Sequence, residues 1–195
     1  MPERTTDEFL LQKAVNGDQA AFLELYDRYR QPIFRFAYRL VGSVEIAEDV
    51  THDCFLSLIR KPENFRPERA SLKTYLFAAA RNLALKHFRD TGREAGLDEI
   101  AEEPKDSSRR GPLRRLLDEE LATKVRDAIL SLPPLQREAL VLFEYEDLSL
   151  AEIGAIVGAD SNTVKARLFR ARDKLRASLG RYFRIGRETA TVRRA

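Results

Sequence analysis

Residues 149–180 read SLAEIGAIVGADSNTVKARLFRARDKLRASLG, and this pattern predicts two short helices joined by a tight turn. Ser149 and Glu152 form a capping box that begins the first helix, and Gly158 is a typical C-terminal stop. Asp160 or Ser161 can cap the second helix, which we expect over 162–179. The stretch is typical of a helix–turn–helix, which places its second helix in the DNA major groove.

The second predicted helix has an apolar face and a basic face. Apolar residues recur at helical spacing and predict the buried side: Val164, Leu168, Ala171, Leu175 and Leu179. The remaining positions offer donors that suit guanine edges and phosphates, together with one aromatic side chain for sugar or a thymine methyl. These candidate DNA-binding residues are Thr163, Lys165, Arg167, Phe169, Arg170, Arg172 and Lys174.

Charge is segregated along the C-terminal part of the chain. Residues 118–160 contain 3 basic and 10 acidic residues, a net charge of −7, whereas residues 161–195 contain 11 basic and 2 acidic residues, a net charge of +9. A basic helix is often only a solvated surface, but a merely soluble surface intersperses the two signs. The segregation therefore favours binding of a polyanion.

The whole-chain composition excludes other classes. The formal net charge of the 195 residues is only +3, and the single cysteine, Cys54, excludes an intramolecular disulfide and a cysteine-based zinc cluster. The N-terminal sequence lacks the apolar core of a signal peptide, and no run of 18 apolar residues occurs. We expect a soluble, cytoplasmic protein without membrane insertion.

A break in the helical pattern divides the chain into two domains. Residues 91–117 contain several Gly and Pro residues, and their 6 basic and 6 acidic side chains cancel, so we expect a flexible linker. Apolar residues on both sides recur at helical spacing, without alternating strands. We therefore predict an all-α protein with two small helical domains, at 1–90 and 118–182, followed by a basic tail at 183–195. This tail is either a phosphate-binding extension or a frayed end.

The N-terminal domain is predicted to contain helices over 6–16, 20–41, 44–60 and 72–89. The third of these helices has an acidic face: Glu45, Glu48, Asp49, His52 and Asp53. That face is either a solvated surface or a docking site for a basic partner. Carboxylates and an imidazole at this spacing could ligate a metal, but the set is too small, so we expect no metal and no cofactor.

The fourth helix and the loop before it carry a second candidate DNA surface. The loop contains Phe65 and Arg66, and the helix places Asn82, Lys86 and Arg89 along one edge. An aromatic side chain, an amide and cations together suit single-stranded DNA, in which an extruded base is stacked or pocketed while cations hold its phosphates. The alternative is a plain amphipathic helix with snorkelling basic residues.

The order of these features resembles the sigma-70 family of bacterial transcription initiation factors, specifically its extracytoplasmic-function (ECF) group. AEDVTHDCF at 47–55 resembles region 2.2 of that group, and SLKTYLFAAARNLALKHFR at 71–89 resembles regions 2.3 and 2.4. Residues 132–175, from LPPLQREALVLF to ARDKL, are similar to region 4. All three motifs in this order are more specific than any one of them.

The resemblance implies a non-enzymatic sigma factor that binds core RNA polymerase, through the clamp of the largest subunit and the flap, and directs it to promoter DNA. It implies polymerase docking through Asp49, Asp53 and the rest of the acidic face. It assigns the upstream, minus-35 duplex to the basic helix at 162–179, and it implies an anti-sigma factor as a further partner. It assigns the melted minus-10 element to the second candidate surface: Phe65, Arg66, Ser71, Lys73, Asn82, Lys86 and Arg89.

Several positions depart from the family pattern. His52 stands where the family usually has glutamine, Tyr75 replaces the usual tryptophan, and the loop before the fourth helix has an extra residue and Pro67.

The promoter sequence, the inducing signal and the anti-sigma factor are not encoded in any motif. We expect the linker to leave the two domains unaligned until polymerase fixes their spacing, so that the chain alone binds promoter DNA weakly.

Two other classes of protein fit parts of the pattern. A conventional helix–turn–helix regulator would use residues 1–90 for sensing or dimerisation and would bind its operator without polymerase. An enzyme is disfavoured, because the sequence contains no paired nucleophile and base and no glycine-rich phosphate loop.

Overall fold

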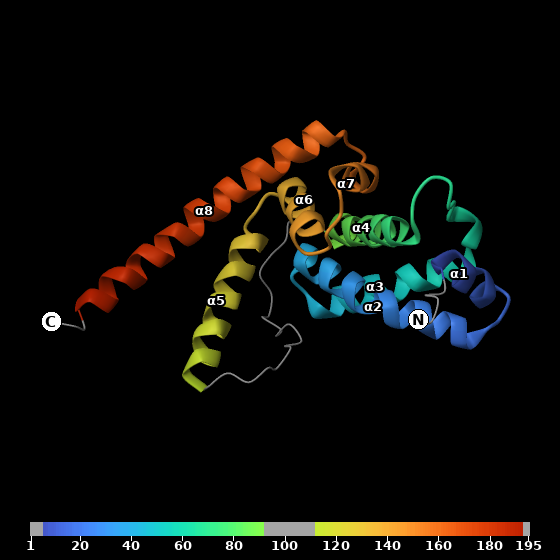
Figure 1. The fold of residues 1–195 in the computed structure, drawn as a ribbon, viewed down its shortest axis with the longest axis horizontal. Helices are drawn as coiled ribbons and strands as arrows, with labels where there is room; N and C mark the ends of the chain where they lie inside the picture. Colours follow the sequence, from blue (N-terminus) through green and yellow to red (C-terminus); the bar gives the residue numbers. More distant parts are fainter. Residues whose placement is uncertain (1–5, 92–111, 193–195) are drawn as a thin grey trace.

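The computed structural model describes residues 6–91 and 112–192, and within these residues every regular element is helical (Figure 1). The predicted all-α class is therefore confirmed. The elements are α1 (Asp7–Val15), α2 (Gln19–Val41), α3 (Val44–Arg60), the 3-10 helix η1 (Pro62–Asn64), α4 (Leu72–Thr91), α5 (Pro112–Leu130), α6 (Pro134–Glu144), α7 (Leu150–Val157) and α8 (Ser161–Val192).

The four N-terminal helices begin and end close to their predicted positions, and local capping signals set the starts of the first three. The side chains of Thr6, Asp18 and Ser43 each accept a hydrogen bond from a backbone N–H in the first turn of α1, α2 and α3, respectively. Gly42 ends α2 in the left-handed conformation, with φ of 77°. The short connections then bring successive helices side by side.

Helices α2, α3 and α4 surround the core of the N-terminal half. Ile33 and Phe36 of α2, Leu58 of α3 and Phe77 of α4 are fully buried. The rings of Phe36 and Phe77 meet edge to face, with centroids 5.2 Å apart. Helix α1 packs on α2, and Asp7 accepts hydrogen bonds from Arg28 and Tyr29 of that helix.

The predicted helix–turn–helix is formed by α7 and α8. Ser149 and Glu152 make both hydrogen bonds of the capping box, and Gly158 ends α7 with φ of 66°. Asp160, one of the two predicted caps, accepts hydrogen bonds from the backbone of Asn162 and Thr163. The turn is tight: a Cβ atom on Gly154 would lie 2.5 Å from the carbonyl oxygen of Ala159, so only glycine fits there.

Two predicted boundaries differ from the structure. Helix α8 does not end near residue 179 but continues to Val192, so most of the predicted tail is helical. A single glycine, Gly180, weakens a helix by about 1 kcal/mol and does not by itself end it. Helix α5 begins at Pro112, inside the predicted linker, and proline is well tolerated in a first turn. The rest of the predicted linker, residues 92–111, lies outside the described residues.

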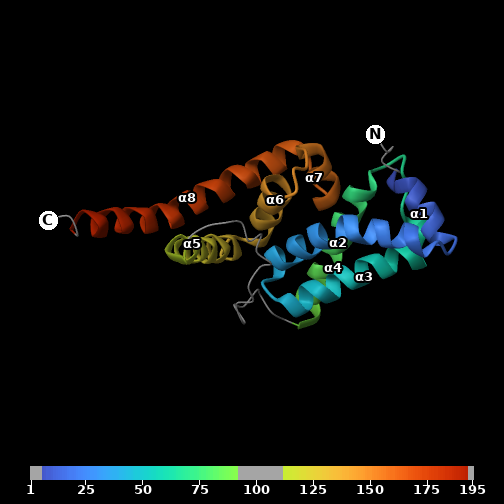
Figure 2. The same ribbon diagram turned by 60° about the horizontal axis from the view of Figure 1, so that its bottom comes forward.

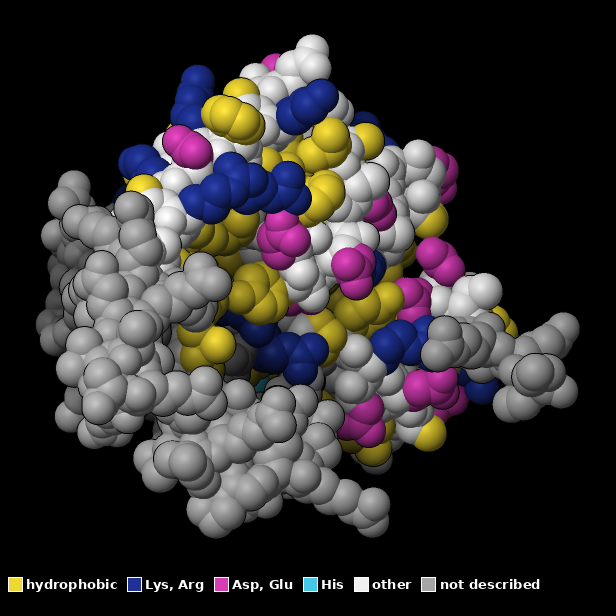
Figure 3. All heavy atoms as spheres, turned by 60° about the vertical axis from the view of Figure 1, so that its left-hand side comes forward, with side chains coloured by type: hydrophobic (Ala, Val, Ile, Leu, Met, Phe, Trp, Pro, Cys, Tyr) yellow, Lys and Arg dark blue, Asp and Glu magenta, His cyan; other side chains and the backbone are white. Residues whose placement is uncertain are grey.

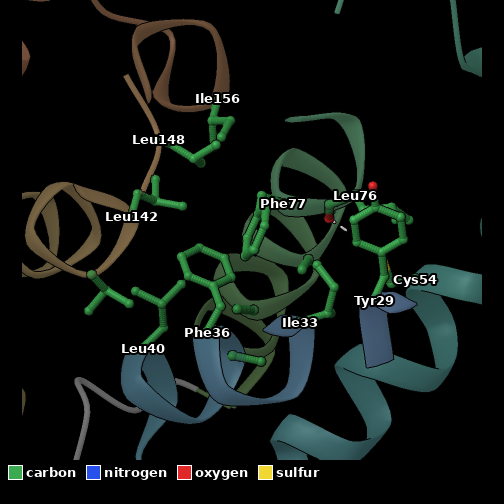
Figure 4. Close-up of a cluster of buried hydrophobic side chains, with 14 of the residues drawn as sticks. Tyr29, Ile33, Phe36, Leu40, Cys54, Leu76, Phe77, Leu142, Leu148 and Ile156 are labelled. Atoms are coloured by element: carbon green, nitrogen blue, oxygen red, sulfur yellow. Dashed lines mark hydrogen bonds between the residues drawn. The ribbon is translucent and has the colours of Figure 1, made fainter. Parts of the chain in front are cut away.

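The two halves of the chain pack against each other in the structure. Helix α7 packs on α4, and α6 and α5 pack on α2 (Figure 2). Figure 4 shows Leu142, Leu148 and Ile156 of the C-terminal half in the same cluster as Leu40 and Phe77 of the N-terminal half, and all five are buried. The expectation that the linker leaves the domains unaligned is therefore wrong for this conformation. Periodicity shows which side of a helix is apolar, but it does not show that part of that side covers another domain.

Candidate nucleic-acid and protein interfaces

The first turns of α8 present a surface suited to DNA. Val164, Leu168 and Ala171 are buried, as predicted, and they fix the rotation of the helix. Phe169 is 67% exposed, although phenylalanine is among the residue types that are most often buried. Four more of the predicted DNA-binding residues are exposed: Thr163, Lys165, Arg170 and Lys174.

The N-terminus of α8 is held by a local hydrogen-bond network. The hydroxyl of Thr163 donates to Oδ2 of Asp160 at 2.6 Å, while Oδ1 accepts the backbone N–H groups of the first turn. These hydrogen bonds lower the pKa of Asp160 below its usual value of 3.8. The ionised side chain of Asp160 thus holds the first turn of α8.

The other two predicted residues on α8 are paired within the protein. Arg167 is half-buried, and its Nη1 lies 3.4 Å from Oε1 of Glu138. Arg172 donates to Glu144 at 2.6 Å and also lies over the ring of Phe143, 5.2 Å from its centroid. Both arginines would have to exchange a carboxylate for a phosphate in order to bind DNA.

In Figure 3 the upper part of the visible face, where the described part of α8 lies, carries Lys and Arg side chains around exposed hydrophobic ones. This combination differs from a solvated basic surface, because an exposed aromatic ring among cations can cover sugar or base atoms. The arrangement therefore favours a nucleic-acid ligand over a surface that serves only solubility.

The acidic face of α3 is formed as predicted. Ala47, Val50, Cys54 and Leu58 are buried on one side of the helix. The opposite side is exposed at every predicted position: Glu45, Glu48, Asp49, His52 and Asp53. A concentrated negative surface on a rigid helix can recruit a basic partner. Within the described residues, no group of three or more His, Cys, Asp or Glu side chains is placed to hold a metal ion.

The second candidate DNA surface is exposed along one edge of α4. Asn82, Lys86 and Arg89 are all exposed, and so are Arg66 and Ser71 at the loop before the helix. The hydroxyl of Ser71 also accepts the backbone N–H of Thr74 at 3.2 Å, which fixes the first turn of α4. An amide and two cations therefore share an accessible edge.

Two residues predicted for this surface are placed differently. Phe65 is buried rather than exposed, because its ring packs edge-on against Tyr75 with centroids 5.5 Å apart. A base could reach it only after a rearrangement of the loop. Lys73 is half-buried, and its amine donates to the backbone carbonyl of Glu146 at 2.6 Å. Each of these side chains makes a contact within the protein that the spacing of residues in the sequence does not predict.

Sequence reasoning missed a set of buried charged residues between the two halves. Arg137 and Glu138 of α6 and Glu146 of the following loop are all buried. Glu138 accepts hydrogen bonds from Arg81 of α4, at 2.6 Å from Nε and 3.2 Å from Nη2. One sequence signal could have identified them. The charged pair Arg137 and Glu138 directly precedes the apolar run ALVLF, and charged side chains beside such a run are seldom buried without partners.

Glu146 lies among cations of the other half. Its carboxylate is 3.9 Å from Nη1 of Arg39, and Arg35 and Lys73 also act on it electrostatically. Burial nevertheless raises the pKa of Glu146 from 4.5 to about 7, because the cost of desolvation exceeds the attraction of these cations. This carboxyl group therefore titrates near neutral pH.

Two family models match the chain. The model of sigma-70 region 2 matches residues 25–94, and the model of sigma-70 region 4 matches residues 122–175. The matched segments contain the acidic face of α3, the exposed edge of α4 and the helix–turn–helix.

Several sigma factors are similar in sequence to this chain over most of its length. It is 33% identical over 183 residues to the ECF RNA polymerase sigma-E factor of Escherichia coli K12, covering 90% of this chain and 95% of that protein. It is 30% identical to the ECF RNA polymerase sigma factor SigW of Bacillus subtilis, covering 88% of this chain and 98% of that protein. It is 34% identical to SigE of Mycolicibacterium smegmatis, over 85% of this chain, but it spans only 65% of that longer protein.

Solved structures show a similar fold. The sigma factor RpoE of Bartonella quintana, determined in complex with the anti-sigma factor NepR, has a TM-score of 0.67 and 25% identity over 82% of this chain and 96% of that one. CnrH, determined in complex with the cytosolic domain of CnrY, has a TM-score of 0.66 and 26% identity over 89% of this chain and 97% of that one. In the part of this chain that the structure describes, no helix is both long enough and apolar enough to cross a membrane.

Proposed function

Because the chain belongs to the ECF group of sigma-70 family RNA polymerase sigma factors, we propose which of its surfaces performs each step of promoter-specific initiation. Membership makes the chain a transcription initiation factor and not an enzyme. Its work is therefore recognition: one surface for core polymerase, one for duplex DNA and one for melted DNA.

The N-terminal part of α8 reads the minus-35 duplex. The observation that carries this assignment is the exposed Phe169 among exposed Lys165, Arg170 and Lys174, on a helix whose other side is buried. Arginine and lysine recognise guanine edges and phosphates, and the ring can cover a thymine methyl or a sugar. Arg167 and Arg172 join this surface when DNA replaces Glu138 and Glu144.

The exposed edge of α4 captures the melted minus-10 strand. Asn82 can accept and donate hydrogen bonds to the edge of an extruded base, while Lys86 and Arg89 neutralise neighbouring phosphates. Arg66 and Ser71 lie at the approach to this edge. Lys73 and Phe65 contribute only if their present contacts are broken.

The acidic face of α3 docks on core polymerase, at the clamp of the largest subunit, and the C-terminal domain contacts the flap. Every charged residue of the face is exposed, so the partner must supply basic side chains. We propose an anti-sigma factor as a further partner, because both similar structures described above were determined as complexes, one of them with a named anti-sigma factor. The chain is proposed to work in the cytoplasm.

The experiment that tests these assignments is run-off transcription with purified core polymerase on a promoter library. We expect the chain to select a subset of promoters that share an upstream and a downstream element. Transcription that is independent of the added chain would contradict the proposal. Operator binding with a two-fold site and no need for polymerase would indicate the conventional helix–turn–helix regulator instead.

A further inference from the structure

One buried carboxylate joins the two helices that we propose as DNA readers. The side chain of Glu138 is only 4% exposed, and it accepts both hydrogen bonds of Arg81, from α4. Its Oε1 also lies 3.4 Å from Nη1 of Arg167, near the beginning of α8. We call this three-residue contact the Glu138 bridge. It ties one arginine of each reading helix to the same group.

The contacts around the Glu138 bridge have the same character. The amine of Lys73, also on α4, donates to the carbonyl of Glu146 at 2.6 Å. Arg39 of α2 lies over the ring of Tyr145, 3.9 Å from its centroid. A carbonyl group and an aromatic ring of the C-terminal half thus cover cations of the N-terminal half.

This packed arrangement cannot read both promoter elements. The minus-35 and minus-10 elements are roughly 25 base pairs apart, which is roughly 85 Å at about 3.4 Å per base pair. In the structure, however, Arg81 and Arg167 reach the same carboxylate. The two halves must therefore separate before α4 and α8 can lie on their separate elements.

We infer that Arg81 is a further DNA-contacting residue and that Glu138 occupies its phosphate-binding position in the chain alone. The inference rests on the proposed function, because it takes α4 and α8 as the reading helices. Arg81 and Lys73 both lie on the side of α4 that faces the C-terminal half, since Lys73 donates to the carbonyl of Glu146 and Arg81 donates to Glu138. Separation of the two halves would expose both cations. Its two parallel hydrogen bonds to a carboxylate have the geometry with which arginine binds phosphate.

DNA and Glu138 therefore compete for the same guanidinium groups. The chain alone binds DNA weakly, because only a fraction of the molecules have the two halves separated and can bind DNA. The apparent affinity is reduced by that fraction. Core polymerase relieves the competition when it holds the two halves apart. The weak binding thus arises because Glu138 already occupies a phosphate-binding position, and not because the two domains are unaligned.

The test uses the full chain without polymerase and a short labelled DNA of random sequence that has a duplex part and a single-stranded part, so that it probes backbone contacts to both kinds of DNA. The variant is Glu138→Gln, and the matched control is Glu144→Gln. Both substitutions remove one negative charge from α6 and one partner from an arginine of α8. Among the described side chains, however, Glu144 pairs with Arg172 of its own half and with no arginine of α4. Small-angle X-ray scattering reports whether the halves separate.

We expect Glu138→Gln to bind this DNA about tenfold more tightly than the original chain and to have a larger radius of gyration. Glu144→Gln should stay compact and change affinity by less than about threefold. Equal gains in the two variants, or a compact Glu138→Gln chain with unchanged affinity, would overturn the inference.

A second substitution tests Arg81 itself. In the Glu138→Gln background, Arg81→Gln should reduce the slope of log affinity against log salt by about 1, because one phosphate contact is lost. An unchanged slope would show that Arg81 does not contact DNA. If Glu138→Gln does not fold, Arg81→Gln alone should still enlarge the chain, and a compact chain would refute the bridge. Failure of the proposed function is distinguishable, since it would abolish polymerase-dependent transcription of the original chain.

Discussion

The guanidinium group of Arg137 in α6 donates a hydrogen bond to the backbone carbonyl of Leu40, near the end of α2, at 2.6 Å. It also donates to the carbonyls of Leu130 and Leu132, at and beyond the end of α5. One buried side chain thus satisfies carbonyl groups at the C-termini of two helices. The last carbonyl groups of a helix have no hydrogen-bond partner within that helix. The contact joins the N-terminal and C-terminal halves of the chain.

Arg137→Ala should lower the free energy of unfolding by about 2–4 kcal/mol, because several buried carbonyls lose their donor. The measurement is urea denaturation followed by circular dichroism. Arg170→Ala is the control, since Arg170 is exposed and its loss should change stability by less than about 0.5 kcal/mol. Equal stability of the two variants would show that Arg137 is not a structural link.

The free energy of unfolding should depend on pH because of Glu146. Its pKa is raised by burial from 4.5 to about 7, so the packed form has its full stability at low pH, where the group is protonated in both states. That stability is lost as the pH rises from about 4.5 to about 7, because the unfolded chain ionises first.

Glu146→Gln should remove this loss, since glutamine is neutral throughout. Denaturation at a series of pH values would show the variant gaining stability relative to the original chain between pH 5 and 7 and a constant difference above that range. A difference that does not depend on pH would contradict the raised pKa. The groups that act on Glu146 are Arg35 and Arg39 of α2, Lys73 of α4 and Asp147 beside it.

The turn of the helix–turn–helix should be sensitive to a single methyl group. Gly154→Ala should destabilise the C-terminal domain by about 1–3 kcal/mol, because the new Cβ would meet the carbonyl of Ala159 at 2.5 Å. Thermal unfolding measures the effect. Gly180→Ala is the matched control: no atom of the described residues lies within 4 Å of its Cβ position, and alanine favours a helix, so the melting temperature of this variant should stay equal or rise.

The helices of this fold are largely predictable from sequence, because their signals are local. The capping box at Ser149, the stop at Gly158 and the cap at Asp160 predict helix ends that the structure confirms. The exposed face of α3 and the exposed positions of α8 follow equally from helical periodicity.

The arrangement of the two halves is not predictable in the same way. The Glu138 bridge joins residues 57 and 29 positions apart, and no local pattern encodes such a pair. Phe65 shows the same limit, because an aromatic residue in a basic loop has the same sequence signature whether it stacks on DNA or on Tyr75.

Charge reversal on α3 should abolish docking to polymerase. Replacing Asp49 and Asp53 with Lys should weaken binding to core polymerase by about tenfold or more, because the proposed partner surface is basic. Both side chains are exposed, so circular dichroism should show an intact fold. Asp27→Lys is the control, since Asp27 is an exposed acid on α2 outside the proposed surface. Undiminished binding of the double variant would exclude this face as the docking site.

The central claim is that α4 and α8 read two separate promoter elements. Its most direct test is run-off transcription by core polymerase on a promoter library, with transcripts sequenced for the original chain, Asn82→Ala and Arg170→Ala. We predict that Arg170→Ala relaxes sequence preference only at the upstream element and that Asn82→Ala relaxes it only at the melted element. Original preferences at both elements in both variants would contradict the account.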